Sequence, residues 1–201
     1  AANDADALQP ALTEAMDAGI KVISLDSAVN KDSRQTHIQQ ADPEKIGRGL
    51  IQAAYEMVDG NGGIAVLSAT AQATNQNLWI EWMKKELEEN PEKYANTPLV
   101  KVAYGDDDPT KSTSETQALL TDSSIKVIIA PTTVGMLAAG KVLQDKQSDV
   151  KLTGLGLPSE MAPFIEDGTC PWMYLWNPVD IGYLSGYTMD ALVKGTITGD
   201  V

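Results

Sequence analysis

Residues 64–79 read IAVLSATAQATNQNLW, and this stretch indicates the class of fold. It opens with an almost continuous apolar run, the pattern of a parallel strand that is covered on both faces. A group of hydroxyl and amide side chains follows, and then an amphipathic helical pattern, NLWIEWMKKELEENP, at 77–91. A buried strand that leads into a surface helix is the repeating unit of α/β folds.

The same alternation extends along the chain in both directions. Short apolar runs, which we predict to be strands, lie at 20–26, 36–40, 64–69, 99–105, 125–131, 151–156 and 170–176. Helical patterns lie at 6–19, 42–60, 77–91, 107–122, 132–145 and 178–195. This order predicts an α/β fold with doubly wound parallel sheets.

Capping residues mark the start of two of these helices. Asp42 and Pro43 suit the N-cap and the first position of one helix, and Asp108 and Pro109 suit those of another. The stretch GDDDPTK at 105–111 also resembles the start of a calcium loop, but Lys111 stands where that loop needs glycine. We therefore interpret it as a capped helix.

The composition is that of a soluble globular protein. Hydrophobic residues make up 43% of the 201 residues and charged residues 21%. The net charge of −13 argues against nucleic acid as a partner, because phosphate binding requires clustered Lys and Arg. No apolar stretch is long enough to cross a bilayer.

The single cysteine and the single histidine offer little for catalysis. Cys170 lies in the apolar run TCPWMYLW, which favours a buried structural thiol over a nucleophile. His37 is interpreted as a strand-end or loop histidine with a satisfied ring. Without a triad or a cluster of metal ligands, we predict that the protein is not an enzyme and carries no metal or cofactor.

The residues that follow the apolar runs have a distinctive composition. Ligands of open α/β sheets bind beyond the carboxyl ends of the strands, so these residues are the candidates for a site. They include one carboxylate, several amides and hydroxyls and two tryptophans, but no Lys or Arg: Asp26-Ser27, Thr74–Asn77 with Trp79, Pro131-Thr132-Thr133, Leu157-Pro158-Ser159 and Trp176-Asn177.

This set of side chains favours an uncharged, hydroxyl-rich ligand. A carboxylate only accepts hydrogen bonds, whereas Asn and Gln both donate and accept, which matches the hydroxyls of a sugar. Trp79 or Trp176 could stack on the C–H face of a sugar ring. A phosphate or carboxylate ligand would instead require Arg, Lys or a glycine-rich helix start.

Each of these residues also has a purely structural interpretation. Asp26 could cap a turn with Ser27, and Thr74–Asn77 could cap the helix that follows. Pro131 and its neighbours could simply begin a helix, as could Asn177. Trp79 and Trp82 are about one helical turn apart, so at least one of them is expected in the core. The convergence of five strand ends favours a site.

The chain resembles the sugar-binding proteins of bacterial ABC importers, which have the type I periplasmic-binding fold. It is most similar to the branch that binds rhamnose and autoinducer-2. The blocks that carry the resemblance run nearly end to end and are specific in their order and spacing: PALTEAMDAGIKVISLDS, IGRGLIQAA, ATNQNLWIEWMK, DPTKSTSETQALL, VIIAPTTVGMLAAG and GLGLPSEMAPFIEDGT.

The resemblance implies two α/β lobes joined by crossing strands, with the ligand between them. Residues 1–40 would be the C-terminal part of the first lobe, residues 41–176 the second lobe and residues 177–201 a return segment to the first lobe. The first lobe is then incomplete in this chain, and we expect a piece of a longer protein. The implied location is periplasmic, or lipid-anchored and extracellular in a Gram-positive bacterium, with the signal peptide outside this chain.

The resemblance also assigns ligand contacts by position. In autoinducer-2 binders, the block that matches SLDS supplies an Asp, here Asp26, and the block that matches ATNQN supplies an Asp–Gln pair, here Asn75 and Gln76. The block that matches IIAPTT supplies Pro131 and Thr133. Asn75 in place of Asp favours a deoxyhexose such as rhamnose over the autoinducer.

We therefore predict a solute-binding component of an ABC importer. It would act as a monomer with a membrane permease as its partner, and its sugar site would be formed by Asp26, Asn75, Gln76, Trp79, Pro131, Thr133, Trp176 and Asn177. Two other functions stay open, autoinducer-2 binding and the sensor domain of a sugar-responsive transcription regulator, which has the same fold. An enzyme is disfavoured, because the strand ends hold no metal cluster, phosphate loop or acid–base pair.

Overall fold

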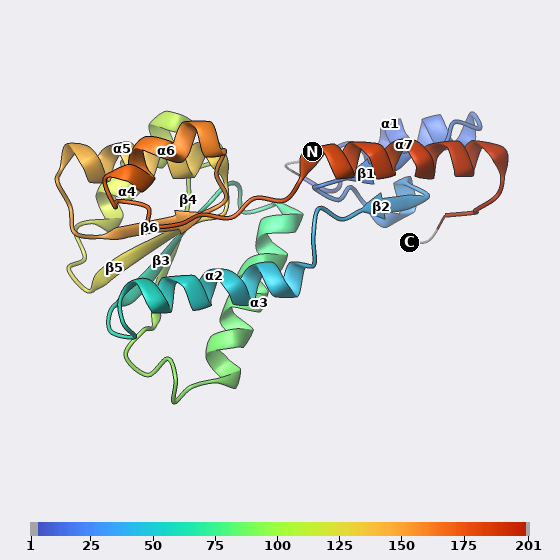
Figure 1. Ribbon diagram of the computed structural model, residues 1–201. Coiled ribbons are helices and arrows are strands. Elements are labelled where there is room, and N and C mark those ends of the chain that lie inside the picture. Colours follow the sequence, from blue (N-terminus) through green and yellow to red (C-terminus); the bar gives the residue numbers. More distant parts are fainter. Residues whose placement is uncertain (1–3, 200–201) are drawn as a thin grey trace. The chain divides into compact units, whose positions relative to one another are not determined.

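Two parallel β-sheets organise the computed structural model, which describes residues 4–199 (Figure 1). Each sheet belongs to one of two units. Unit 1 comprises Ala1–Asp42, Gln72–Asn77 and Trp176–Val201, and unit 2 comprises Pro43–Ala71 and Leu78–Leu175. The expected division after residues 40 and 176 runs close to two of these boundaries, but Gln72–Asn77 groups with unit 1. The assignment of the units to the lobes of a longer protein stays a prediction.

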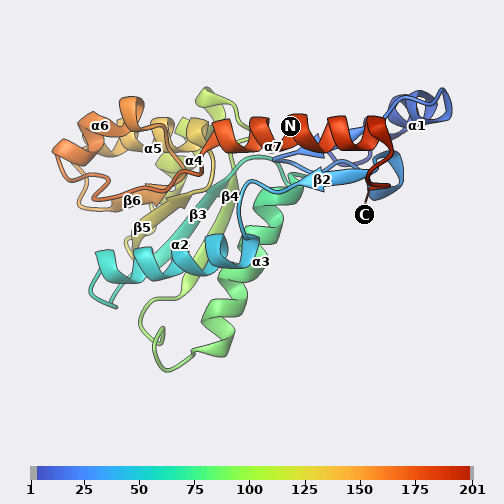
Figure 2. The ribbon, with the colours of Figure 1, turned by 45° about the vertical axis from the view of Figure 1, so that its right-hand side comes forward.

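Unit 2 contains a four-stranded sheet in the order β4-β3-β5-β6, and all of its neighbouring strands are parallel. The strands are β3 (Gly63–Ser68), β4 (Leu99–Tyr104), β5 (Ile125–Ala130) and β6 (Lys151–Gly154). One face is covered by α2 (Pro43–Met57) and α3 (Thr74–Glu89), and the other by α4 (Pro109–Leu119), α5 (Thr133–Asp145) and α6 (Pro158–Glu166) (Figure 1 and Figure 2). Cover on both faces buries all of β3, which explains its continuous apolar run.

Unit 1 contains a two-stranded parallel sheet, β1 (Ile23–Leu25) and β2 (Thr36–Ile38), in which Leu25 lies opposite Ile38. Its helices are α1 (Gln9–Asp17), the 3₁₀ helix η1 (Lys31–Ser33) and α7 (Pro178–Lys194). Asn177 caps α7 by accepting from the backbone N of Val179 at 3.0 Å. Among the described residues, no helix combines the length and apolar character that crossing a bilayer requires.

One face of α7 carries an exposed apolar stripe. Val179, Tyr183 and Tyr187 are 73%, 66% and 61% exposed, and their spacing of four residues places them on the same side of the helix. The two tyrosine rings lie 4.7 Å apart between their centroids, and the Tyr183 hydroxyl donates to that of Tyr187 at 3.1 Å. Exposed apolar stripes of this kind are typical of surfaces that pack against another segment or molecule.

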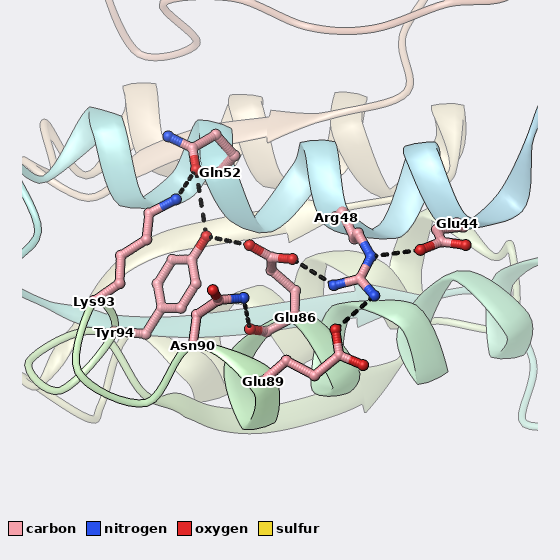
Figure 3. A network of polar contacts seen from close by, with 8 residues as sticks. All are labelled: Glu44, Arg48, Gln52, Glu86, Glu89, Asn90, Lys93 and Tyr94. Carbon is pink, nitrogen blue, oxygen red and sulfur yellow. Dashed lines mark hydrogen bonds and ion pairs between the residues drawn. The ribbon is translucent and has the colours of Figure 1, made fainter.

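A polar network joins α2 to α3 and to the loop that follows α3 (Figure 3). The Arg48 guanidinium donates to Glu44 at 2.8 Å, to Glu86 at 2.6 Å and to Glu89 at 2.7 Å. The Tyr94 hydroxyl donates to the other oxygen of Glu86 at 2.9 Å. Because several charges share one arginine, this network fixes the two helices more firmly than an isolated surface ion pair would.

Gly47 lets α2 and α3 approach each other closely. A Cβ atom at this position would lie 2.5 Å from both the backbone O of Trp79 and the Cβ of Trp82. Gly49, on the same helix, has open space at the corresponding point. Gly47 is therefore needed for the close contact between the helices, whereas Gly49 could be replaced by a larger residue without a clash.

We expect Gly47→Ala to lower the free energy of unfolding by about 1–3 kcal/mol, because the added methyl group overpacks the helix contact. Gly49→Ala is the matched control and should raise stability by about 0.5–1 kcal/mol through helix propensity alone. Urea denaturation of both variants measures the difference. Equal effects of the two substitutions would show that the helices do not pack through Gly47.

Four sequence-based expectations about the elements are wrong in detail. Residues 170–176 form no strand, since their only described pairing is a single bridge between Tyr174 and Leu155. Helix α3 begins at Thr74, earlier than the expected residue 77. The amphipathic pattern at 77–91 predicts that Leu78, Trp82 and Leu87 face inward, but the buried face of α3 carries Trp79, Ile80 and Met83. Helix α6 was not expected, because two prolines interrupt its pattern, one at its first position and one inside it.

The isolated residues with reactive side chains are structural, as expected. The His37 ring lies 2.8 Å from Ser24 Oγ through Nδ1 and 3.3 Å from Gln39 Oε1 through Nε2. Cys170 is fully buried, and this burial raises the pKa of its thiol to about 11. Asp108 caps α4 by accepting from the backbone N of Lys111 at 2.7 Å, which confirms the capped helix.

Candidate ligand-binding site

The candidate residues are divided between the two units. Asp26, Asn75, Gln76, Trp176 and Asn177 belong to unit 1, and Trp79, Pro131 and Thr133 belong to unit 2. Asp26, Pro131 and Thr133 follow the carboxyl ends of parallel strands, and Asn75 and Gln76 lie in the first turn of α3. Trp79 lies further along α3, and Trp176 and Asn177 directly precede α7.

Asp26 is an unpaired acceptor at the carboxyl end of β1. Its backbone N donates to the backbone O of Ile38 at 3.1 Å, which extends the pairing of β1 with β2 by one residue. Its backbone adopts a left-handed φ of 62°, which Asp tolerates better than most residues. Its Oδ1 is buried and has no hydrogen-bond partner among residues 4–199. The side chain therefore does not cap a turn with Ser27.

The burial of Asp26 also changes its protonation. Desolvation raises the pKa of the carboxyl group above its ordinary value of 3.8, although the charge of His37 acts in the opposite direction. A buried carboxylate without donors is unfavourable for the protein by itself. It becomes favourable when donors such as hydroxyl groups approach it.

Thr74 lies beside the segment that follows β1. Its Oγ1 lies 3.5 Å from Ser27 Oγ and donates to the backbone O of Ala28 at 3.2 Å. Two polar segments that are nearly 50 residues apart in sequence are thus neighbours within unit 1. This part of the expected convergence is present in the structure.

Asn75 and Gln76 lie in the first turn of α3. The Oδ1 of Asn75 accepts from the backbone N of the next residue, Gln76, at 2.8 Å. Within the described residues, the Nδ2 of Asn75 donates to no acceptor. This local bond uses the oxygen of the amide and leaves its Nδ2 as a donor for a ligand.

The aromatic candidates differ in exposure. Trp79 is 1% exposed and lies on the buried face of α3, which confirms that at least one of Trp79 and Trp82 belongs to the core. Trp176 is half-buried in unit 1. Asn177 is exposed and uses its Oδ1 as the N-cap of α7, so its Nδ2 is the group left for other contacts. Contacts of these residues with a ligand stay predictions.

Pro131 and Thr133 lie at the carboxyl end of β5 in unit 2. Pro131 is buried, and Thr133 is the half-buried first residue of α5. The hydroxyl of Thr132, between them, donates to the Asp107 carboxylate and makes no cap bond. This bond joins the ends of β4 and β5 at the edge of the sheet where ligands of α/β proteins bind.

Sequence reasoning missed two polar groups at these edges. Asp107 follows β4, and Gln40 follows β2 with its side chain buried. Each lies only two or three residues beyond the strand, the position that predicted the other candidates. In the sequence, Asp107 belongs to the pattern of a capped helix start, and Gln40 to the end of a strand pattern. Neither pattern by itself indicates a site.

The geometry supports the binding of hydroxyl groups. Asp26 supplies a buried acceptor, and Asn75 supplies a donor. Ser27 follows Asp26 in the chain, and its hydroxyl lies 3.5 Å from that of Thr74. Hydroxyl groups can rotate to donate or accept as a ligand requires. An uncharged ligand with several hydroxyls would satisfy such groups without a counter-charge.

Comparison with known proteins gives the family. A family described as a periplasmic binding protein domain matches residues 1–197. The chain belongs to this family. Its type I periplasmic-binding fold confirms the predicted fold class, and the family consists of binding proteins rather than enzymes, in line with expectation.

Solved structures of family members are similar over the whole chain. An ABC transporter solute-binding protein from Clostridium phytofermentas, solved with bound L-rhamnose, is 52% identical with a TM-score of 0.93 over 100% of this chain and 64% of its own. A sugar ABC transporter protein from Actinomyces odontolyticus is 43% identical with a TM-score of 0.75, over 100% of this chain and 65% of its own. The chain thus spans less than two thirds of the length of these relatives.

A more distant relative shows the fold alone. LsrB from Clostridium saccharobutylicum, solved in complex with AI-2, is 24% identical with a TM-score of 0.86, over 97% of this chain and 63% of its own. The resemblance that the sequence blocks indicated is confirmed by the family match and by the rhamnose-bound protein.

Proposed function

We propose that this chain is part of the solute-binding component of a bacterial ABC importer, and that its ligand is a neutral deoxyhexose, L-rhamnose or a close relative. The observation that carries the proposal is the buried Oδ1 of Asp26, which has no hydrogen-bond partner among residues 4–199. The next residue in the chain, Ser27, has its hydroxyl 3.5 Å from that of Thr74. The similarity to a protein solved with L-rhamnose supports the choice of sugar. The partners are then the sugar and a membrane permease, and the protein acts outside the cytoplasmic membrane.

The two units fit a division into lobes. We assign residues 1–40 and 177–201 to a first lobe and residues 41–176 to a second, with Gln72–Asn77 packed on the first. The exposed stripe of Val179, Tyr183 and Tyr187 supports this division, because an apolar surface of this size is normally covered. The greater length of the solved relatives provides chain that can cover it.

A thermal-shift screen of the full-length protein tests the function. The panel contains L-rhamnose, other deoxyhexoses, pentoses and autoinducer-2, with a sugar phosphate as the charged control. Binding to the native state raises the melting temperature by mass action, so L-rhamnose or a related deoxyhexose should give the largest shift. A shift with autoinducer-2 or the sugar phosphate, and none with any deoxyhexose, would refute the proposal.

Replacement of Asn75 tests one contact. In Asn75→Ala the ligand loses a donor from Nδ2, and we expect affinity for the sugar to fall by about 1–3 kcal/mol, because a buried hydroxyl is left unpaired. Isothermal titration calorimetry measures the change. Asn61→Ala, in the turn before β3, is the control and should bind as the wild type does; an unchanged Kd for Asn75→Ala would remove Asn75 from the site.

A further inference from the structure

Gln40 is a buried amide without a partner, just beyond β2. Its side chain is 8% exposed, and neither Oε1 nor Nε2 has a hydrogen-bond partner among residues 4–199. Burying an amide away from water is unfavourable unless its donors and acceptor are paired. Because nearly all buried polar side chains in folded proteins are paired, this one requires a specific explanation.

Two other glutamines near β2 have amides with partners inside unit 1, in contrast to the amide of Gln40. The Oε1 of Gln35 accepts from the backbone N of Val22 at 2.5 Å, so that side chain holds β1 and β2 together. Gln39 is exposed, and its Oε1 lies 3.3 Å from the Nε2 of His37. Both amides have partners within unit 1, whereas that of Gln40 has none there or elsewhere in the described chain.

The position of Gln40 in the sheet points to a ligand. Strands β1 and β2 are parallel with Leu25 opposite Ile38, and carrying this register two residues further sets Ser27 opposite Gln40. Asp26, which precedes Ser27, also has a buried oxygen without a partner in the described residues. Two unpaired polar groups therefore follow the carboxyl ends of neighbouring parallel strands, where α/β sheets bind their ligands.

We propose that Gln40 contacts the sugar directly and helps to determine which sugar is bound. This inference rests on the proposed function and adds a contact to it. Asp26 only accepts hydrogen bonds, whereas the amide of Gln40 donates through Nε2 and accepts through Oε1. One sugar hydroxyl donates to Asp26, and another pairs with Gln40. A sugar without that second hydroxyl leaves the buried amide unpaired and binds more weakly.

Gln40→Met gives the first test, since Met has a similar length and no hydrogen-bonding amide. In the full-length protein we expect the Kd for L-rhamnose to rise about 10-fold to 100-fold. The melting temperature of the unliganded protein should stay the same or rise, because the variant no longer buries an unpaired amide. Gln40→Leu repeats the test if the Met variant does not fold. Gln39→Met is the matched control and should leave the Kd unchanged.

Sugar analogues test the contact itself. Derivatives of L-rhamnose that each lack one ring hydroxyl are titrated into the wild type and into Gln40→Met. For one of them, the wild type should lose about tenfold or more in affinity while Gln40→Met loses much less, since the partner of that hydroxyl is already gone. Equal losses in both proteins for every derivative would overturn the inference.

The failures of the two proposals are distinguishable. A wild type that binds L-rhamnose, together with a Gln40→Met variant of the same Kd, overturns the role of Gln40 and leaves the proposed function intact. A wild type that binds no deoxyhexose overturns both.

Discussion

Asp26→Asn is expected to weaken binding of L-rhamnose to the full-length protein by about 100-fold. The carboxylate can accept from two sugar hydroxyls, and bonds to a charged acceptor are the stronger kind. The amide retains the shape but loses the charge and one acceptor. Calorimetric titration of the variant at neutral pH measures the change, with Asp32→Asn, an exposed acid of the same unit, as the control.

The same substitution should leave the unliganded protein as stable as before or more stable. Burial desolvates the Asp26 carboxylate and its Oδ1 has no hydrogen-bond partner among residues 4–199, so the net effect of its charge is unfavourable for folding. A loss of affinity without a loss of stability is typical of a binding residue and contrary to what a purely structural Asp would show. Weaker binding that only follows a lower melting temperature would contradict the assigned role.

The pH dependence follows from the direction of the pKa shift. Burial raises the pKa of Asp26 in the free protein above 3.8, and hydroxyl donors of the ligand favour the charged form and lower the pKa again. Affinity should therefore be full above the raised pKa and fall as the pH decreases through it. Stability of the free protein changes in the opposite sense, because the native state holds this proton more tightly than the unfolded chain. Both dependences should disappear in Asp26→Asn.

Gly154→Ala is expected to lower the free energy of unfolding by about 3–5 kcal/mol or to prevent folding, because it combines a steric clash with backbone strain. Gly154 ends β6 opposite Ala130, and an added Cβ would lie 1.9 Å from the backbone O of Ala130. Its φ of +149° is also a conformation that is nearly confined to glycine. The contact is with backbone, so no side chain can move aside.

Substitution of a second glycine, Gly168, distinguishes the effect of the steric clash from that of the backbone strain. Gly168 also has a positive φ, +79°, but a Cβ there would meet nothing within 4 Å. Gly168→Ala should therefore cost only about 1–2 kcal/mol, the strain of the left-handed backbone alone. Guanidinium denaturation of both variants compares them. If Gly154→Ala were no more destabilising than Gly168→Ala, β5 and β6 would not be as close as the structure has them.

The strands of the unit 2 sheet could be predicted because their apolar sequence patterns agree with their burial in the folded chain. The strands β3 and β5 are covered on both faces and so have continuous apolar runs. The run at 170–176 is apolar for another reason: Cys170 packs in the core, and the segment beyond it forms only one bridge. Apolar character alone does not distinguish these two cases.

The candidate site was predictable only in part. Asp26 and Thr74 could be chosen because they follow strand patterns, and the structure places Thr74 beside the segment after Asp26. Gln40 gave no such signal, because a polar residue that ends a short strand is ordinary in sequence. Its burial without a partner is a property of the folded chain. The core position of Trp79 likewise depends on how α3 packs in the folded chain, where Gly47 of α2 permits a close approach to Trp79 and Trp82.

Calorimetric titration of the full-length protein with L-rhamnose, at low and at high salt, tests most directly whether Asp26 and the uncharged polar groups at these strand ends hold a neutral sugar. We predict one site with a Kd in the micromolar range or tighter, and nearly the same Kd at both salt concentrations, because a neutral ligand forms no ion pair that salt could screen. No heat of binding with any deoxyhexose, together with tight and salt-sensitive binding of a charged ligand such as a sugar phosphate, would contradict it.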